Sequence, residues 1–123
     1  MSRLGQARYA LAGHLPILRR SASSGAVSEL PVGGPLLGIE ARGQYESMVV
    51  EADPGDLFVL LSDGLTEIFQ RDGREFGMDG IRAAAFGDGA AEPKELAERV
   101  IAKAAQYGQQ VDDQTVLFVR ITA

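Results

Sequence analysis

The sequence has 123 residues, of which 46% are hydrophobic and 24% are charged, a composition typical of a soluble globular protein with room for one core. The net charge of −5 is spread along the chain and no basic run exceeds two residues, so a nucleic-acid-binding surface is not indicated. The chain contains no cysteine, which excludes disulfides and thiolate zinc sites and is compatible with the cytoplasm, where we expect the protein. The apolar residues 9–18 are interrupted by glycine, histidine and proline, so they predict neither a signal peptide nor a membrane span.

The first half of the chain predicts short strands separated by turns. These strands cover residues 7–14, 15–20, 25–32, 45–52 and 57–61. The first two are spaced like a hairpin. A strong turn signal, Asp53-Pro54-Gly55-Asp56, joins the last two, so we expect them to be antiparallel neighbours.

The second half predicts two helices and a closing strand. Asp79 is placed to cap a short helix over residues 81–86. Pro93 suits the first turn of an amphipathic helix, which Gly108 ends. Residues 115–122 form a last, nearly continuous apolar strand. The apolar face of the amphipathic helix consists of Leu96, Val100, Ile101, Ala104 and Tyr107.

Three carboxylates stand at the ends of the two most apolar strands, Asp63 after one and Asp112 and Asp113 before the other. Residues 57–61 and 116–119 lack polar alternation, which predicts that both strands are central in a sheet. If the strands are antiparallel neighbours, the end of one lies beside the start of the other and the three acids form one cluster. Crowded carboxylates repel one another and resist desolvation, so this cluster favours a hard divalent cation such as Mg²⁺ or Mn²⁺.

Each motif also has a simpler interpretation. Ser62 or Asp63 could cap a short helix, and Asp112-Asp113 could be a solvated turn. Taken alone, each motif favours that reading, but their occurrence together at matching strand ends favours the metal site. His14 is the only histidine and is more typical of a hydrogen-bonded turn, so we assign it no catalytic role. The glycine-rich residues 33–39 lack the spacing of a phosphate-binding loop.

The chain resembles the C-terminal half of the metal-dependent type 2C protein phosphatases of the bacterial SpoIIE kind. The resemblance extends over nearly the whole chain and rests on these segments, in order: AGHLP, GGPLLGI, PGDLFVLLSDGLTE, GREFGMDGI and DDQTVLFVRI. It implies an α+β fold, a β-sandwich of antiparallel sheets flanked by helices. Residues 1–123 would then be the C-terminal portion of a single phosphatase domain, whose N-terminal part is missing from the chain.

The resemblance also implies a site and a reaction. Asp63 matches the metal ligand of the family's Asp-Gly motif, and Asp112 matches the first ligand of its late Asp-Asp/Asn motif. Gly64 and Asp113 occupy supporting positions. The implied activity is Mn²⁺- or Mg²⁺-dependent hydrolysis of phosphoserine and phosphothreonine, with a metal-activated water and no side-chain nucleophile. The implied substrates in bacteria are often anti-sigma-factor antagonists, and a sensory or receiver domain is expected upstream.

Three hypotheses follow from these residues. The one we favour is a piece of a phosphatase whose core is completed upstream, because Asp63 and Asp112 keep their flanking patterns. The family's first metal motif would precede AGHLP, so we expect the isolated chain to be inactive, to bind metal weakly and to self-associate. The second hypothesis is a non-catalytic remnant that acts as a binding or dimerisation module. The third is an unrelated acidic-cluster protein that binds a cation for stability.

Overall fold

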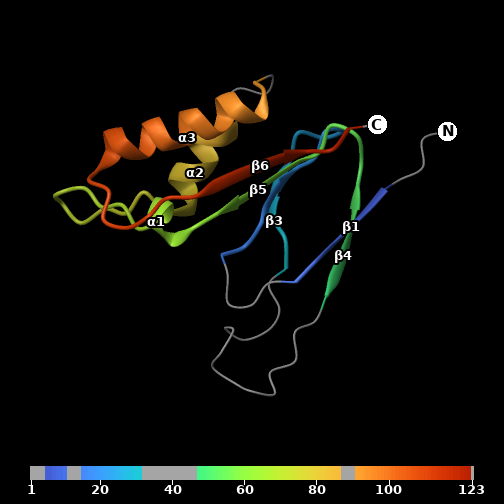
Figure 1. The fold of residues 1–123 in the computed structure, drawn as a ribbon, viewed down its shortest axis with the longest axis horizontal. Coiled ribbons are helices and arrows are strands. Elements are labelled where there is room, and N and C mark those ends of the chain that lie inside the picture. The colour runs from blue at the N-terminus through green and yellow to red at the C-terminus, as the bar shows by residue number, and fades with distance from the viewer. Residues whose placement is uncertain (1–4, 11–14, 32–46, 87–90, 123) are drawn as a thin grey trace, which may run out of the picture. The chain divides into compact units, whose positions relative to one another are not determined.

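The computed structural model of the chain describes residues 5–10, 15–31, 47–86 and 91–122. His14 and the glycine-rich residues 33–39 lie outside these ranges. The chain divides into two compact units, Met1–Phe58 with Arg120–Ala123, and Val59–Val119. Figure 1 labels the strands and helices, which are β1 (Gly5–Tyr9), β2 (Leu18–Arg20), β3 (Val27–Glu29), β4 (Met48–Ala52), β5 (Leu57–Leu61), α1 (Asp63–Thr66), α2 (Gly77–Phe86), α3 (Pro93–Tyr107) and β6 (Val116–Arg120).

The first unit contains two antiparallel strand pairs. Strand β1 pairs with β4, with Gly5 opposite Ala52 and Tyr9 opposite Met48. Strands β2 and β3 form a hairpin in which Leu18 lies opposite Glu29. The buried apolar residues of this unit are Ile17, Leu18, Leu30, Ala52, Leu57 and Phe58.

The strand pairing differs from the sequence-based prediction. Strand β1 pairs with β4, not with β2, and β4 does not pair with β5, which lies between β2 and β6 in the order β3-β2-β5-β6. The turn itself forms, since the Asp56 N–H donates to the Asp53 carbonyl at 3.0 Å. The Asp56 carboxylate also accepts hydrogen bonds from Ala22 N–H and from Arg19, which both belong to the β2–β3 hairpin. These bonds hold the chain leaving the turn next to β2, so the turn passes the chain from one sheet to the other.

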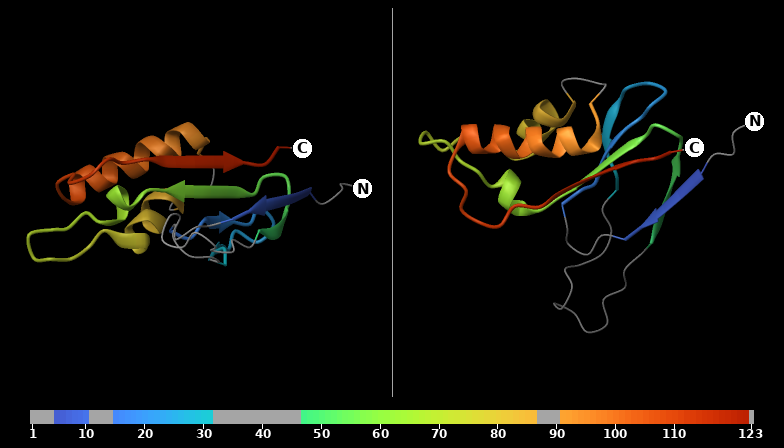
Figure 2. Two further views of the ribbon diagram at one scale, coloured as in Figure 1. Left: turned by 60° about the horizontal axis from the view of Figure 1, so that its bottom comes forward. Right: turned by 45° about the horizontal axis from the view of Figure 1, so that its top comes forward.

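The second unit contains the three helices together with residues 59–61 of β5 and 116–119 of β6. Helix α2 contacts both α1 and α3. In the right view of Figure 2, α2 and α3 lie on the same side of these two strands. The buried apolar residues of this unit are Val59, Leu61, Leu65, Ile68, Phe76, Ile81, Ala84, Ala85, Ala91, Leu96, Val100, Ala104 and Phe118.

Both β5 and β6 were predicted to be central strands, but among the described residues only β5 has a strand on each side. Strand β5 is an inner strand and four of its five residues are buried. Strand β6 ends the strand order, and its Leu117 and Val119 side chains are 52% and 38% exposed. A continuous apolar run predicts cover on both faces, but in the described part of the chain this face of β6 is only partly covered.

The long helix follows the prediction closely and the short one does not. Helix α3 begins at Pro93, ends at Tyr107 and has Gly108 as its C-cap. Its residues Leu96, Val100 and Ala104 are buried as expected, whereas Ile101 is 36% exposed. Helix α2 begins at Gly77, so Asp79 lies in its first turn and does not cap it. In the described residues, no helix has the length and apolar character needed to cross a membrane.

Candidate metal site beside the end of β5

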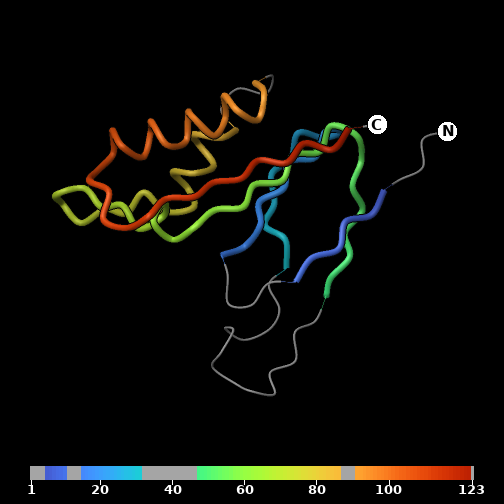
Figure 3. The backbone as a smooth tube through the Cα atoms, viewed as in Figure 1, coloured from blue at the N-terminus to red at the C-terminus, as the bar shows by residue number. Residues whose placement is uncertain are grey.

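The segment after β5 lies against the segment before β6. The Ser62 N–H donates to the Thr115 carbonyl at 2.9 Å, and the Thr115 N–H donates to Ser62 Oγ at 2.9 Å. Figure 3 shows the two segments running side by side in opposite directions. The strands are therefore antiparallel neighbours, the condition on which the predicted acid cluster depended, and Asp63 and the Asp112-Asp113 loop lie at the same end of the sheet.

Gly64 permits a very close approach of the two segments. A Cβ atom at position 64 would collide with the Asp113 carbonyl and would lie 3.2 Å from the Asp112 carbonyl oxygen. The Gln114 side-chain amide donates to the Gly64 carbonyl at 3.4 Å. Gly64 does not have a positive φ, so the close approach of the Asp113 main chain is what requires glycine here, not an unusual turn geometry.

Asp63 is the first residue of α1, and its carboxylate is exposed. The Asp63 carbonyl accepts hydrogen bonds from Glu67 N–H at 2.8 Å and Thr66 Oγ1 at 3.2 Å, but no described residue donates to its carboxylate. Ser62 occupies the N-cap position, but its side chain makes no capping bond. Its hydroxyl oxygen instead accepts a hydrogen bond from Thr115 N–H, just before β6. No side-chain hydrogen bond of Ser62 or Asp63 in the described structure therefore supports the capping interpretation.

Asp112 and Asp113 lie in an exposed loop before β6. The Asp113 N–H donates to Asp112 Oδ1 at 2.7 Å, which fixes one oxygen of the Asp112 carboxylate against its own main chain. The Gln110 side-chain amide donates to the Asp112 carbonyl at 3.1 Å. A hollow of about 290 Å³ lies beside this loop, lined by Gln110, Val111, Asp112 and Asp113.

The predicted cluster of three carboxylates is not present. Among the described residues, no group of three or more histidine, cysteine, aspartate or glutamate side chains is arranged to hold a metal ion. The three acids are exposed, and Asp112 turns one oxygen to its neighbour's N–H. Asp63 and Asp112 offer only carboxylate oxygens, which suit Mg²⁺ or Mn²⁺ in kind, but two side chains are an incomplete ligand set.

Asp56, a carboxylate with a strong structural role, was not singled out from the sequence as a site residue. Asp56 is fully buried, and its Oδ2 lies 2.8 Å from the guanidinium Nη2 of Arg19. Ala22 N–H and Asp53 N–H donate to it at 2.8 and 3.0 Å. Burial raises the pKa of Asp56, but the two N–H donors and the Arg19 charge outweigh burial and hold this pKa below its ordinary value. The sequence predicted a turn at residues 53–56, but it did not indicate that the Asp56 side chain is buried.

Nearly the whole chain matches one known protein family. The family described as stage II sporulation protein E (SpoIIE) matches residues 2–122. The chain belongs to the SpoIIE family. No curated protein matches the chain at a significant level.

Solved structures of SpoIIE-like phosphatase domains share the fold of this chain. The Mn-presoaked phosphatase domain of the cell fate determinant SpoIIE from Bacillus subtilis is 21% identical, with a TM-score of 0.71 over 98% of this chain and 52% of that one. The SiaA-PP2C domain of Pseudomonas aeruginosa is 25% identical, with a TM-score of 0.69 over 86% and 42%. The RsbU and RsbW domains of Rv1364c from Mycobacterium tuberculosis are 22% identical, with a TM-score of 0.66 over 98% and 33%.

These likenesses confirm the predicted fold class, antiparallel sheets with helices in the arrangement of a PP2C-type phosphatase domain. The chain spans about half the length, or less, of the solved chains it matches. It therefore shares only a part of the fold that those domains contain.

Proposed function

We propose that the chain forms part of a metal-dependent protein serine/threonine phosphatase, as the C-terminal portion of a single SpoIIE-type domain. Membership of the SpoIIE family supports this proposal. The observation that carries it is the antiparallel pairing that brings Asp63 beside the loop of Asp112 through the Ser62–Thr115 hydrogen bonds. Both acids that the family resemblance implies as metal ligands thus lie at one end of one strand pair.

In this proposal Asp63 and Asp112 hold Mn²⁺ or Mg²⁺, and two neighbours position them. Gly64 lets the main chain of residues 112–113 approach the start of α1. The Asp113 N–H orients the Asp112 carboxylate through its 2.7 Å hydrogen bond. The bound cation supplies positive charge for phosphate oxygens and lowers the pKa of water. The chain then needs no side-chain nucleophile, in keeping with its lack of cysteine.

The substrate in this proposal is a phosphorylated protein. The family resemblance favours bacterial partner switching, with a phosphorylated anti-sigma-factor antagonist as the substrate class and a cytoplasmic location. A sensory or receiver domain upstream of the chain belongs to the same proposal. One solved relative contains domains named RsbU and RsbW together, which supports a link to protein partners in the family.

Mn²⁺ binding to the chain tests the metal assignment. We expect weak binding, measured by calorimetry or by the electron paramagnetic resonance of free Mn²⁺, and its loss in Asp63→Asn and in Asp112→Asn. Asp72→Asn is the matched control, because Asp72 is an exposed aspartate paired with Arg74 at 2.7 Å. Binding that survives both ligand substitutions overturns the assignment.

Hydrolysis of a phosphoserine peptide tests the completeness of the site. The described residues contain no group of three metal-ligating side chains, so we expect the chain to turn over such a peptide slowly or not at all with Mn²⁺. Rapid Mn²⁺-dependent turnover that Asp63→Ala abolishes would confirm the phosphatase and overturn the expectation that the ligand set is incomplete.

A non-catalytic binding or dimerisation module is the second candidate. The observation that favours it is β6, which ends the strand order among the described residues and exposes Leu117 and Val119. Self-association through this strand without any Mn²⁺ binding would favour the module over the phosphatase.

A further inference from the structure

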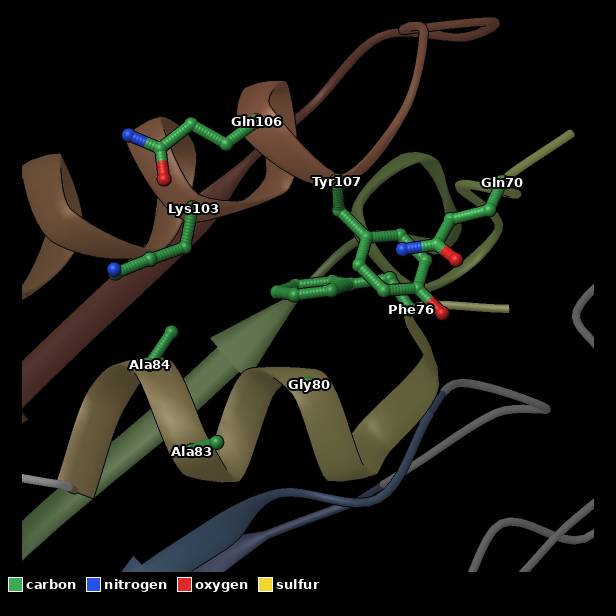
Figure 4. Close-up of a pocket in the computed structure, with 8 residues that line it drawn as sticks. All are labelled: Gln70, Phe76, Gly80, Ala83, Ala84, Lys103, Gln106 and Tyr107. Carbon is green, nitrogen blue, oxygen red and sulfur yellow. The ribbon is translucent and has the colours of Figure 1, made fainter. Parts of the chain in front are cut away.

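A second surface of the molecule lies between α2 and α3 and involves neither Asp63 nor Asp112. Two neighbouring hollows of about 480 and 470 Å³ share the lining residues Gln70 and Tyr107, and we call the two together the α2–α3 groove. Figure 4 shows its first part, with Ala83 and Ala84 projecting from α2 and with Lys103 and Gln106 projecting from α3. All its lining residues belong to the same compact unit.

The floor of the groove is apolar and held in place by packing. The Phe76 and Tyr107 rings lie 5.2 Å apart at an angle of 52°, a favourable tilted aromatic contact. The Tyr107 hydroxyl donates to the Glu75 carbonyl at 3.2 Å, which fixes the second ring. Gly80 leaves room for the Phe76 ring, since a Cβ atom there would collide with it. The floor is therefore formed before any ligand binds, which lowers the entropic cost of binding.

The rim of the groove is positively charged although the protein is acidic. The chain carries a net charge of −5, yet the lining of the two hollows includes Lys103 and Arg71 and no carboxylate. Neither cation has an ion pair in the described part of the chain. The acid adjacent to Arg71 in sequence, Asp72, is already bound to Arg74 at 2.7 Å. Phe69, which lines the second hollow, is 50% exposed.

We propose that the α2–α3 groove binds an acidic peptide segment of a protein partner. An apolar side chain of the peptide packs on the Phe76 floor, and carboxylates on either side of it meet Lys103 and Arg71. The amides of Gln70 and Gln106 can both donate to and accept from a peptide main chain. Two neighbouring hollows open to solvent suit an extended chain, whereas a small molecule favours a site that encloses most of its surface. This function goes beyond the proposed phosphatase activity and requires no metal.

Fluorescence anisotropy of a labelled peptide tests the proposal on the full chain without Mn²⁺. The probe is a short capped peptide with one leucine flanked by glutamates, and the comparison peptides replace the glutamates by lysines or the leucine by serine. We expect saturable binding of the first peptide alone. Lys103→Glu and Arg71→Glu should each weaken it about three- to tenfold. The matched control is Lys94→Glu, an exposed lysine of α3 outside both hollows, which should leave the affinity unchanged.

A second pair of variants tests the apolar floor. Ala83 is exposed on α2, so Ala83→Phe fills the first hollow without burying a new group in the core and should abolish binding. Ala102→Phe makes the same change on a part of α3 outside the groove and should not. Equal binding of the lysine peptide, or binding insensitive to Lys103→Glu and Ala83→Phe, overturns the proposal. If no peptide binds but Ala83→Phe prevents self-association, the occupant is a second copy of the chain and the proposal is also overturned.

Discussion

The guanidinium Nη2 of Arg19 lies 2.8 Å from Oδ2 of Asp56, a carboxylate with no exposed surface. Asp56 stands in the turn that leads into β5, and Arg19 stands in β2, so this pair ties the start of β5 to the β2–β3 hairpin. Arg19 also lies over the Phe58 ring, with its Cζ atom 5.9 Å from the ring centre.

Removal of the Asp56 carboxylate is expected to destabilise the protein strongly. Asp56→Ala leaves the Arg19 charge and two N–H donors without their acceptor, which should lower the free energy of unfolding by about 3 kcal/mol. This is the lower end of the usual range, because the Arg19 side chain is 20% exposed and keeps some contact with water. Urea unfolding measures the change. The control Asp72→Ala breaks an exposed pair and should cost less than about 0.5 kcal/mol, and an equal loss in both variants would contradict the prediction.

The same carboxylate predicts a pH dependence. The pKa of Asp56 is lower in the folded protein than in the unfolded chain, so the folded state is the weaker proton binder. The contribution of Asp56 is therefore fully present above the ordinary aspartate pKa of about 3.9 and is lost as the pH falls through the lower folded value. The difference in stability between wild type and Asp56→Asn should be constant near neutral pH and shrink below about pH 4. A difference that stays constant down to the acid transition would contradict it.

Gly64→Ala tests the close approach of the Asp113 main chain. In an ordinary helix alanine is about 1 kcal/mol better than glycine, so Ala102→Gly, at an exposed position of α3, should lower the stability. At position 64 we expect the opposite sign, a loss of about 1–3 kcal/mol on substitution by alanine, because the new Cβ atom collides with the Asp113 carbonyl. Thermal or urea unfolding of both variants decides the matter. A stabilising effect of Gly64→Ala would mean that the two segments are not in contact.

Mn²⁺ is expected to stabilise the wild-type protein modestly through Asp63. A ligand that binds only the folded state raises its stability by RT ln(1 + [L]/Kd), about 1 kcal/mol at tenfold excess over Kd. Asp63→Asn should abolish this gain, while Asp79→Asn, an exposed acid in the first turn of α2, should retain it. A capping role predicts a different pattern, a loss of about 0.5–2 kcal/mol in Asp63→Ala whether or not Mn²⁺ is present. Thermal melts with and without millimolar Mn²⁺ distinguish the two.

Strand β6 is expected to mediate self-association of the isolated chain. It ends the strand order among the described residues, and its exposed Leu117 and Val119 make a strand edge that a second copy can pair with. Sedimentation should show a concentration-dependent dimer, which Leu117→Lys and Val119→Lys disrupt. Val111→Lys adds the same charge at an 81% exposed position outside the strand and should leave the dimer intact. A wild-type monomer at high concentration would refute this prediction.

Much of the local structure followed from the sequence. Helix α3 begins at Pro93 and ends just before Gly108, as predicted. Proline suits the first turn of a helix, and glycine suits the position that follows its last residue. The apolar run Leu57–Leu61 correctly indicated an inner strand. Asp63 follows one apolar strand and Asp112 precedes the other, which indicated that their segments would meet if the strands were antiparallel neighbours, as they are. These features depend on residues close in sequence or on the pattern of a single strand.

Strand partners and burial of single side chains were decided by the tertiary structure. The turn at residues 53–56 is compatible with a hairpin, yet the hydrogen bonds that Arg19 and Ala22 donate to Asp56 hold β5 beside β2, and β4 pairs with β1. An apolar sequence such as that of β6 does not reveal which neighbour covers it. The three predicted ligands likewise share one end of a strand pair without forming a three-acid cluster, because the carboxylate directions depend on local hydrogen bonds such as Asp113 N–H to Asp112 Oδ1. Sequence patterns specify which segments are apolar, and only long-range contacts decide which of them meet and which acid is buried.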